Sequence, residues 1–156
     1  MKKFLLSIAV LVMSMISVYA DNRQDALNFY NNYINAANSY SDSVTSMYSP
    51  NAKIIRQVVK PDGSLVDVYT NTSTYIKQMK IAQAGAKLRQ YKNFYSNIKI
   101  TKIDNDTYKI SSLRQPIGET YKLKTYAVVK KQSNGTWLII EEMMQTKQQI
   151  FLKYAK

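Results

Sequence analysis

The feature that most constrains the fold is a pair of β-rich runs on either side of an Asn-Gly turn. The runs YKLKTYAVVKK and TWLIIEEMMQ occupy residues 121–131 and 136–145, and Asn134-Gly135 lies between them. Asn-Gly in this setting strongly indicates a β-hairpin, because both residues accept the positive φ of a tight turn. Neither run alternates cleanly, since residues 127–129 and 137–140 are apolar on both faces. The sequence therefore predicts a central hairpin that is covered on both sides.

The rest of the chain supplies helices and further strands. Residues 21–39 carry apolar side chains at helical spacing, and residues 41–48 form a shorter segment that is expected to stop before Pro50. Strands are expected at 52–59 and 65–69, with turn chemistry at 60–64, and at 94–103 and 107–113. A second long helix, capped by Asn71 or Thr72, is expected to reach Ala86, and residues 148–154 favour a short terminal helix. The order helix, helix, two strands, helix, four strands predicts an α+β fold with helices on one face of a curved antiparallel sheet.

The N-terminus has the pattern of a signal peptide. Lys2-Lys3 precedes an apolar run from Phe4 to Val18, which ends in the small residue Ala20. The run is short for a membrane anchor, so cleavage between Ala20 and Asp21 is the prediction. Residues 21–156 would then form a single domain, periplasmic or secreted, with no integral membrane segment. The chain has no cysteine, so it cannot be a lipoprotein, and its formal net charge of +12 falls to +10 once Lys2 and Lys3 are removed.

The element order and two local motifs resemble the nuclear-transport-factor-2-like superfamily, which includes the SnoaL-like and ketosteroid-isomerase-like proteins. One motif is YSPNAKI at residues 48–54, and the other is NGTWLIIEE at residues 134–142. The resemblance implies a cone, in which a bent sheet wraps around helices and leaves a pocket at the open end. Many members of the superfamily dimerise, so the resemblance also raises a dimer as an expectation. The chain departs from the family pattern at Asn51, where Asp is frequent, and it has no histidine.

The residue types narrow the chemistry. The absence of His and Cys excludes a His-based triad, a thiol nucleophile and an ordinary zinc site, and the four isolated glycines match no nucleotide-binding motif. We therefore expect no metal and no cofactor. Carboxylate with tyrosine remains as an acid–base pair. Glu141 and Glu142 are the weak catalytic candidates, because adjacent strand residues face opposite ways and one of them must point inward. The alternative is that both are partly solvated, or that one pairs with a lysine.

Strict alternation assigns these side chains to two faces. Trp137, Ile139, Glu141 and Met143 would share one face, and Leu138, Ile140, Glu142 and Met144 the other. Trp137 is predicted to be a core residue. Aromatic, Met and Ile side chains with one or two polar groups are typical of a pocket for a small apolar ligand, and the candidates for its lining are Tyr30, Tyr33, Met47, Tyr48, Ile54, Tyr75, Met79, Tyr126, Trp137, Glu141 and Met143. The alternative is that these large side chains fill the cone completely.

Three functions fit these observations. The first is an exported, non-enzymatic module that binds a small apolar or amphipathic ligand. The second is a protein-interaction domain with a filled pocket, acting as a homodimer or with an envelope protein partner. The third is an isomerase or dehydratase that uses Glu141 or Glu142 with a tyrosine. Nucleic acid is not expected as a partner, because the lysines are scattered and the protein is expected to be exported.

Overall fold

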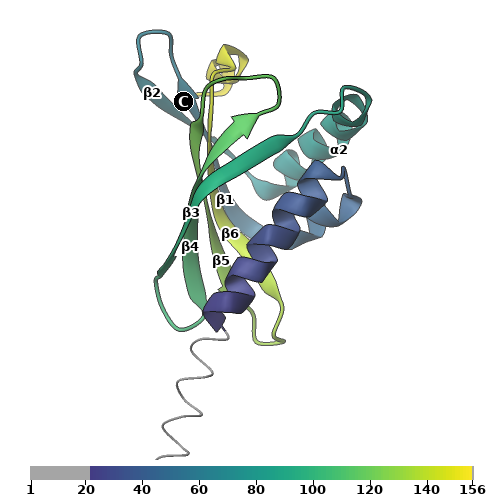
Figure 1. The fold of residues 1–156 in the computed structure, drawn as a ribbon, viewed down its shortest axis with the longest axis vertical. Coiled ribbons are helices and arrows are strands. Elements are labelled where there is room, and N and C mark those ends of the chain that lie inside the picture. The colour runs from purple at the N-terminus through teal and green to yellow at the C-terminus, as the bar shows by residue number, and fades with distance from the viewer. Residues whose placement is uncertain (1–21, 156) are drawn as a thin grey trace, which may run out of the picture.

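The computed structural model describes residues 22–155, and the expected signal peptide with its cleavage between Ala20 and Asp21 lies outside them. Within this range, two long helices lie against one face of a curved six-stranded sheet (Figure 1). The arrangement is the α+β architecture expected from the order of the elements. No helix in the described residues is long and apolar enough to cross a membrane.

The first helix, described over residues 22–38, buries a stripe of small and aromatic side chains. Ala26, Tyr30 and Tyr33 recur at spacings of three and four and are all buried against the sheet. The helix stops at Tyr40, which has a left-handed backbone with φ of 59°. The Ser41 amide then donates to the Ala36 carbonyl at 2.9 Å, which closes the last turn.

The second long helix, α2 (Thr72–Leu88), begins where the sequence predicted a cap. The Asn71 side-chain oxygen accepts a hydrogen bond from the Thr74 amide at 2.9 Å. The two shorter segments are 3₁₀ helices, η1 (Asp42–Met47) and η2 (Gln149–Tyr154). Both lie where the sequence indicated short helical segments.

Six strands form the sheet of the described residues. They are β1 (Tyr48–Val59), β2 (Leu65–Thr70), β3 (Asn93–Lys102), β4 (Thr107–Pro116), β5 (Leu123–Lys131) and β6 (Trp137–Thr146). β1 begins four residues earlier than expected and contains Pro50. A register shift between Tyr48 and Lys53 accommodates this start, because the proline then needs no ladder partner.

The strands are ordered β2-β1-β6-β5-β4-β3. The hairpin of β5 and β6 is therefore central, as predicted. All neighbouring pairs are antiparallel except β1 and β6, which run parallel and pair Ile54 with Glu142 and Arg56 with Met144. The sheet is therefore mixed, and its one parallel pair joins the first and the last strand of residues 22–155.

The two faces of the hairpin differ in how well they are covered. The inner face meets the helices, and Ala127, Val129 and Ile139 on it are almost fully buried. On the outer face Tyr126 and Met143 are partly exposed, while Val128 between the neighbouring strands is buried. The expectation of cover on both sides therefore holds only for the inner face, since neighbouring strands alone shield the outer one.

A β-bulge in β6 changes which side chains face inward. Val129 pairs with Ile139, but Val128 pairs with Glu141, so Ile140 has no partner of its own. The extra residue advances the alternation by one position, which turns both Ile139 and Glu142 toward the helices. Strict alternation was therefore wrong beyond Ile139, because it placed Glu141 and Met143 on the face of Ile139. Glu142 and Met144 point inward instead.

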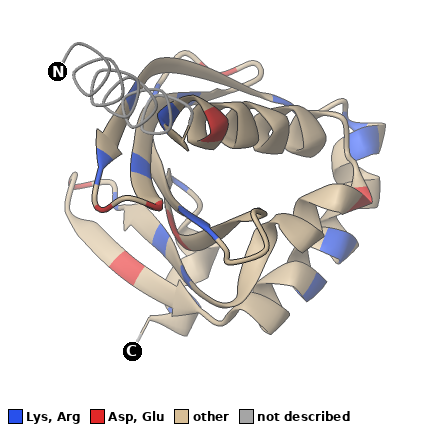
Figure 2. Cartoon of the chain, turned by 90° about the horizontal axis from the view of Figure 1, so that it is seen from below, with Lys and Arg blue, Asp and Glu red and all other residues tan. Residues whose placement is uncertain are grey.

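Lysines and arginines are spread over the strands and over α2 rather than gathered on one face (Figure 2). The few acidic residues are similarly dispersed. The charge of the described residues is therefore that of a solvated surface, with no continuous basic stripe.

Candidate functional site

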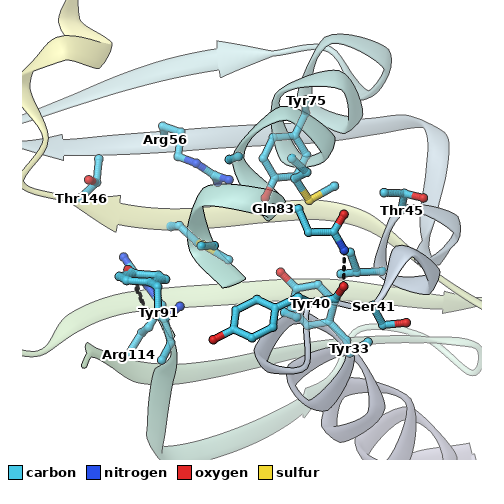
Figure 3. Close-up of a pocket in the computed structure, with 18 of the residues that line it drawn as sticks. Tyr33, Tyr40, Ser41, Thr45, Arg56, Tyr75, Gln83, Tyr91, Arg114 and Thr146 are labelled. Carbon is cyan, nitrogen blue, oxygen red and sulfur yellow. Dashed lines mark hydrogen bonds between the residues drawn. The ribbon is translucent and has the colours of Figure 1, made fainter. Parts of the chain in front are cut away.

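A cavity of about 290 Å³ lies between the helices and the inner face of the sheet. Its wall combines apolar side chains, tyrosines, two arginines and a few neutral polar groups (Figure 3). Side chains from both long helices, both 3₁₀ helices and the strands β1, β3, β4 and β6 contribute to it. The lining residues are Tyr33, Ala36, Ala37, Tyr40, Ser41, Val44, Thr45, Arg56, Tyr75, Met79, Ala82, Gln83, Ala86, Tyr91, Asn93, Tyr95, Arg114, Met144, Gln145, Thr146, Gln148 and Phe151. Among residues 22–155, no Asp or Glu lines this cavity.

Arg56 enters the cavity from the middle of β1. It lies on the same face of the strand as Ile54 and Val58, which are both fully buried, so the strand directs its guanidinium toward the helices. The guanidinium lies over the ring of Tyr75, 4.5 Å from its centroid. Burial opposes the charge, but the surrounding tyrosines, led by Tyr75, and Glu142 together raise the pKa of Arg56 above its ordinary value. Arg56 is therefore a fixed positive charge in the wall.

Arg114 reaches the cavity from β4 and is held more firmly. Its Nη1 donates to Asn93 Oδ1 at 2.7 Å, and its Nη2 donates to the Gln145 carbonyl at 2.8 Å. Both partners also line the cavity. Two hydrogen bonds fix the plane of this guanidinium and leave it no freedom to turn.

Glu142 lies behind the cavity wall, and two tyrosine hydroxyls bind its carboxylate. Tyr33 donates to Oε1 at 2.9 Å and Tyr48 donates to Oε2 at 2.7 Å. The two hydroxyl oxygens are themselves 3.0 Å apart. Tyr33 lines the cavity while Glu142 and Tyr48 do not, so Tyr33 separates the carboxylate from the cavity.

The inner tyrosines form a connected aromatic cluster. Tyr33 contacts Tyr30 and Tyr48, with ring centroids 6.1 Å and 6.0 Å away, and Tyr48 contacts Tyr75 at 5.4 Å. Burial, and then the negative charge of Glu142, raise the pKa of Tyr33 and of Tyr48 well above the ordinary value. These hydroxyls therefore stay protonated and act as hydrogen-bond donors.

A second tyrosine–glutamate pair lies on the outer face of the same strands. The Tyr126 hydroxyl donates to Glu141 Oε1 at 2.6 Å, and Lys109 Nζ lies over the Tyr126 ring, 3.8 Å from its centroid. Burial and then the hydrogen bond to Glu141 raise the pKa of Tyr126. This pair is partly exposed and has no access to the cavity.

The structure distributes the predicted lining residues over three places. Tyr33, Tyr75 and Met79 line the cavity. Five others, Tyr30, Met47, Tyr48, Ile54 and Trp137, belong to the core or pack against it. Tyr126, Glu141 and Met143 lie on the outer face. Trp137 is partly buried rather than enclosed, with its ring 6.1 Å from that of Tyr108.

Sequence reasoning missed the polar groups of the wall. Arg56 could have been found from its position between the buried Ile54 and Val58, and Arg114 from the alternation of β4, where Ile110 and Ser112 are also buried. Tyr40 carried no such signal, because its position depends on the left-handed turn that ends the first helix. Residues 22–155 contain no group of three or more His, Cys, Asp or Glu that could hold a metal ion.

Comparison with known proteins places the fold. A proposed scytalone dehydratase from Novosphingobium aromaticivorans is 12% identical with a TM-score of 0.61, and the match covers 83% of this chain and 86% of that one. A nuclear-transport-factor-2-like protein of unknown function from Shewanella oneidensis is 12% identical with a TM-score of 0.58, covering 79% and 98%. A proposed ketosteroid isomerase from Shewanella frigidimarina is 18% identical with a TM-score of 0.54, covering 75% and 91%.

The chain therefore has the nuclear-transport-factor-2-like fold, with the bent sheet and inner helices of the SnoaL-like and ketosteroid-isomerase-like proteins. No protein-family model matches the sequence. No curated protein matches it either. At these identities the likeness concerns the fold alone, and function has to be argued from the site.

Proposed function

We propose that this protein is an exported, non-enzymatic binding protein that holds a small amphipathic molecule in the cavity. The observation that carries the proposal is the wall itself, in which apolar and aromatic side chains surround a few fixed polar groups. Ligand sites have this composition, and about 300–1,000 Å³ is their usual volume. At about 290 Å³ the cavity suits a small ligand, and its presence argues against a cone filled by its own side chains.

The arrangement of the carboxylates supports binding rather than catalysis. A general base must reach the proton that it removes. Glu142 accepts hydrogen bonds from Tyr33 and Tyr48 at its two oxygens, and it does not line the cavity. Glu141 lies on the opposite face with Tyr126. Neither carboxylate can approach a ligand in the cavity without a change of structure.

A second candidate function, an isomerase or dehydratase, rests on one contact. Tyr33 lines the cavity and its hydroxyl lies 2.9 Å from Glu142, so this residue is the route by which a proton could pass between a ligand and the carboxylate. Exchange of acidic C–H protons of a bound ketone with deuterated water would support this reading if Tyr33→Phe abolished it. If these C–H protons exchange no faster with the protein than in buffer alone, binding remains the proposed function.

Native mass spectrometry of the protein purified from its own host tests ligand binding directly. We expect a mass adduct that is lost on denaturation, and the same spectrum reports whether the protein is a dimer. The variant Met79→Trp adds bulk to the cavity wall, whereas Met143→Trp makes the same change on the outer face. The adduct should disappear only in Met79→Trp. An adduct retained in Met79→Trp would contradict binding in this cavity.

The export part of the proposal has a separate test. N-terminal sequencing of protein recovered from the cell envelope or the culture medium should begin at Asp21. A membrane-bound form that retains Met1 would contradict cleavage after Ala20 and favour an anchor.

A further inference from the structure

One nitrogen of a charged group in the cavity wall lacks a hydrogen-bond partner. Arg56 Nη1 is buried and has no hydrogen-bond partner among the described residues, although its guanidinium lies over Tyr75. An unsatisfied buried donor costs about 1–3 kcal/mol, and more when it is charged. A ligand atom that accepts a hydrogen bond from this nitrogen, once the guanidinium turns it toward the cavity, would remove that cost.

Two further polar atoms of residues that line the same cavity are buried and unpaired. The Nε of Arg114 is buried without a partner, although both of its terminal nitrogens are bonded. The hydroxyl of Tyr40 is also buried without a partner. Figure 3 shows that these side chains come from different sides of the cavity, Arg56 from β1, Arg114 from β4 and Tyr40 from the end of the first helix. Two of these three buried unpaired atoms are arginine nitrogens, which can only donate, and the Tyr40 hydroxyl can donate as well.

The charges of the inner face also favour a ligand that carries a negative charge. Arg56 and Arg114 bring two positive charges to the wall, and Glu142 behind it brings one negative charge. Glu142 is already bound by Tyr33 and Tyr48, whose hydroxyls stay neutral. One positive charge is left without compensation by these groups. A ligand with a single negative charge would balance it at low cost, because the charge would pair with a guanidinium.

The remainder of the wall limits the body of such a ligand. Val44, Met79, Ala82, Ala86 and Phe151 present apolar surface from η1, α2 and η2. A compact apolar group would bury its surface there, and the volume of about 290 Å³ limits that group to one or two rings or a short chain.

From these observations we infer that the ligand is a small organic monocarboxylate, whose carboxylate binds the guanidinium of Arg56 and whose apolar body packs against α2. This inference rests on the proposed binding function and narrows it to a ligand class. A planar guanidinium matches the two oxygens of a carboxylate, which favours this anion over a single-point acceptor. Arg114 would contribute charge while its terminal nitrogens stay bonded within the protein.

Paired probes test the charge directly. Phenylacetate and hexanoate are compared by calorimetric titration with their neutral amides, phenylacetamide and hexanamide, and with phenyl phosphate. We expect each carboxylate to bind about tenfold to a hundredfold more tightly than its amide, the range that one charge-assisted interaction provides. Equal binding of acids and amides would overturn the inference and leave the binding function intact. Tighter binding of phenyl phosphate than of both carboxylates would overturn the monocarboxylate class.

Variants at Arg56 test the position. Arg56→Met should reduce carboxylate binding about tenfold or more without changing amide binding, and Arg56→Lys should restore only part of it, because lysine keeps the charge but lacks the planar fork. The control Arg89→Met changes an exposed arginine at the end of α2 and should bind as the wild type does. Full carboxylate affinity in a folded Arg56→Met variant would overturn the assignment.

A neutral aromatic probe separates the two proposals. If indole binds in the wild type and is excluded by Met79→Trp, while neither carboxylate binds more tightly than its amide, the cavity is a site but the monocarboxylate inference is wrong. If indole, acids and amides all fail to bind the folded protein, the binding function itself falls.

Discussion

The two sides of the central hairpin carry the same pair of residue types in opposite settings. On the inner side Glu142 is 1% exposed and receives hydrogen bonds from Tyr33 and Tyr48. On the outer side Glu141 is partly exposed and receives one from Tyr126 at 2.6 Å. The shorter bond belongs to the more exposed pair, so distance alone does not rank their importance. The cost of removing a partner depends on whether water can replace it.

The largest expected effect is alkaline unfolding, which depends on the inner tyrosines. Burial raises the pKa of Tyr30 to about 12 and raises those of Tyr33, Tyr48, Tyr75 and Tyr95 as well. In the unfolded chain the same hydroxyls have a pKa of about 10. Their contribution to stability is therefore complete below pH ~10 and is lost as the pH rises toward the folded-state pKa, by about 1.4 kcal/mol per pH unit for each tyrosine.

Denaturant titrations from neutral pH to about pH 12, followed by tyrosinate absorbance, check this expectation. Folded protein should keep its inner tyrosines protonated, and their absorbance should rise together with unfolding. In Tyr30→Phe the loss of stability with pH should be shallower by the share of one tyrosine. A free energy of unfolding that stays constant well above pH ~10 would contradict the burial of these hydroxyls.

Replacing the two glutamates in turn gives the sharpest contrast between the faces. Glu142→Ala leaves two buried hydroxyls without their acceptor and Arg56 without a nearby negative charge, so it should reduce the free energy of unfolding by about 3–5 kcal/mol. Glu141→Ala should cost about 1 kcal/mol or less, because water replaces the lost contact. Urea denaturation of both variants measures the difference. Equal losses would show that the two carboxylates are equally solvated.

The aromatic end of the hairpin provides a packing test. Trp137 is partly buried and packs against Tyr108, so Trp137→Ala should cost about 2 kcal/mol, below the range of about 3–5 kcal/mol for a fully buried tryptophan. Leu138→Ala, one residue along on the outer face, should cost about 1 kcal/mol. Thermal melts of the two variants compare them, and a larger loss for Leu138→Ala would reverse the assignment of faces.

The smallest expected effects come from removing single hydroxyls. Tyr33→Phe deletes one buried donor to Glu142 and should cost about 1–2 kcal/mol, whereas Tyr126→Phe should cost about 0.5 kcal/mol. Because both changes preserve the ring, packing stays the same and only the hydrogen bond is tested. Identical stabilities of the two variants would mean that burial adds nothing to this bond.

Local rules were sufficient for most of the fold. The cap at Asn71, the turn at Asn134-Gly135 and the central hairpin follow from residue chemistry within a few positions. The parallel pairing of β1 with β6 has no local signal, because residues far apart in the chain form it. It is visible only once the whole sheet is assembled.

The site was harder to predict because it depends on register. The unpaired Ile140 reverses the facing of every later residue in β6, so the sequence could not say which glutamate enters the interior. Tyr33, Tyr75 and Met79 lie on regular helices, where helical spacing was a sufficient guide. Arg56 was overlooked because a charged residue in a strand is usually taken as solvent-facing.

The parallel pair also sets the order in which the molecule can fold. Tyr48 and Glu142 are 94 residues apart, yet their hydrogen bond lies at the centre of the interior. During synthesis the two long helices and β1 to β5 emerge before β6, which joins β1 to β5, so the core cannot close until β6 is available. Folding should therefore be a late event, in the slower range of milliseconds to seconds that non-local strand pairing imposes. A chain that ends before β6 would leave the edges of β1 and β5 open to other strands, and we expect such fragments to aggregate.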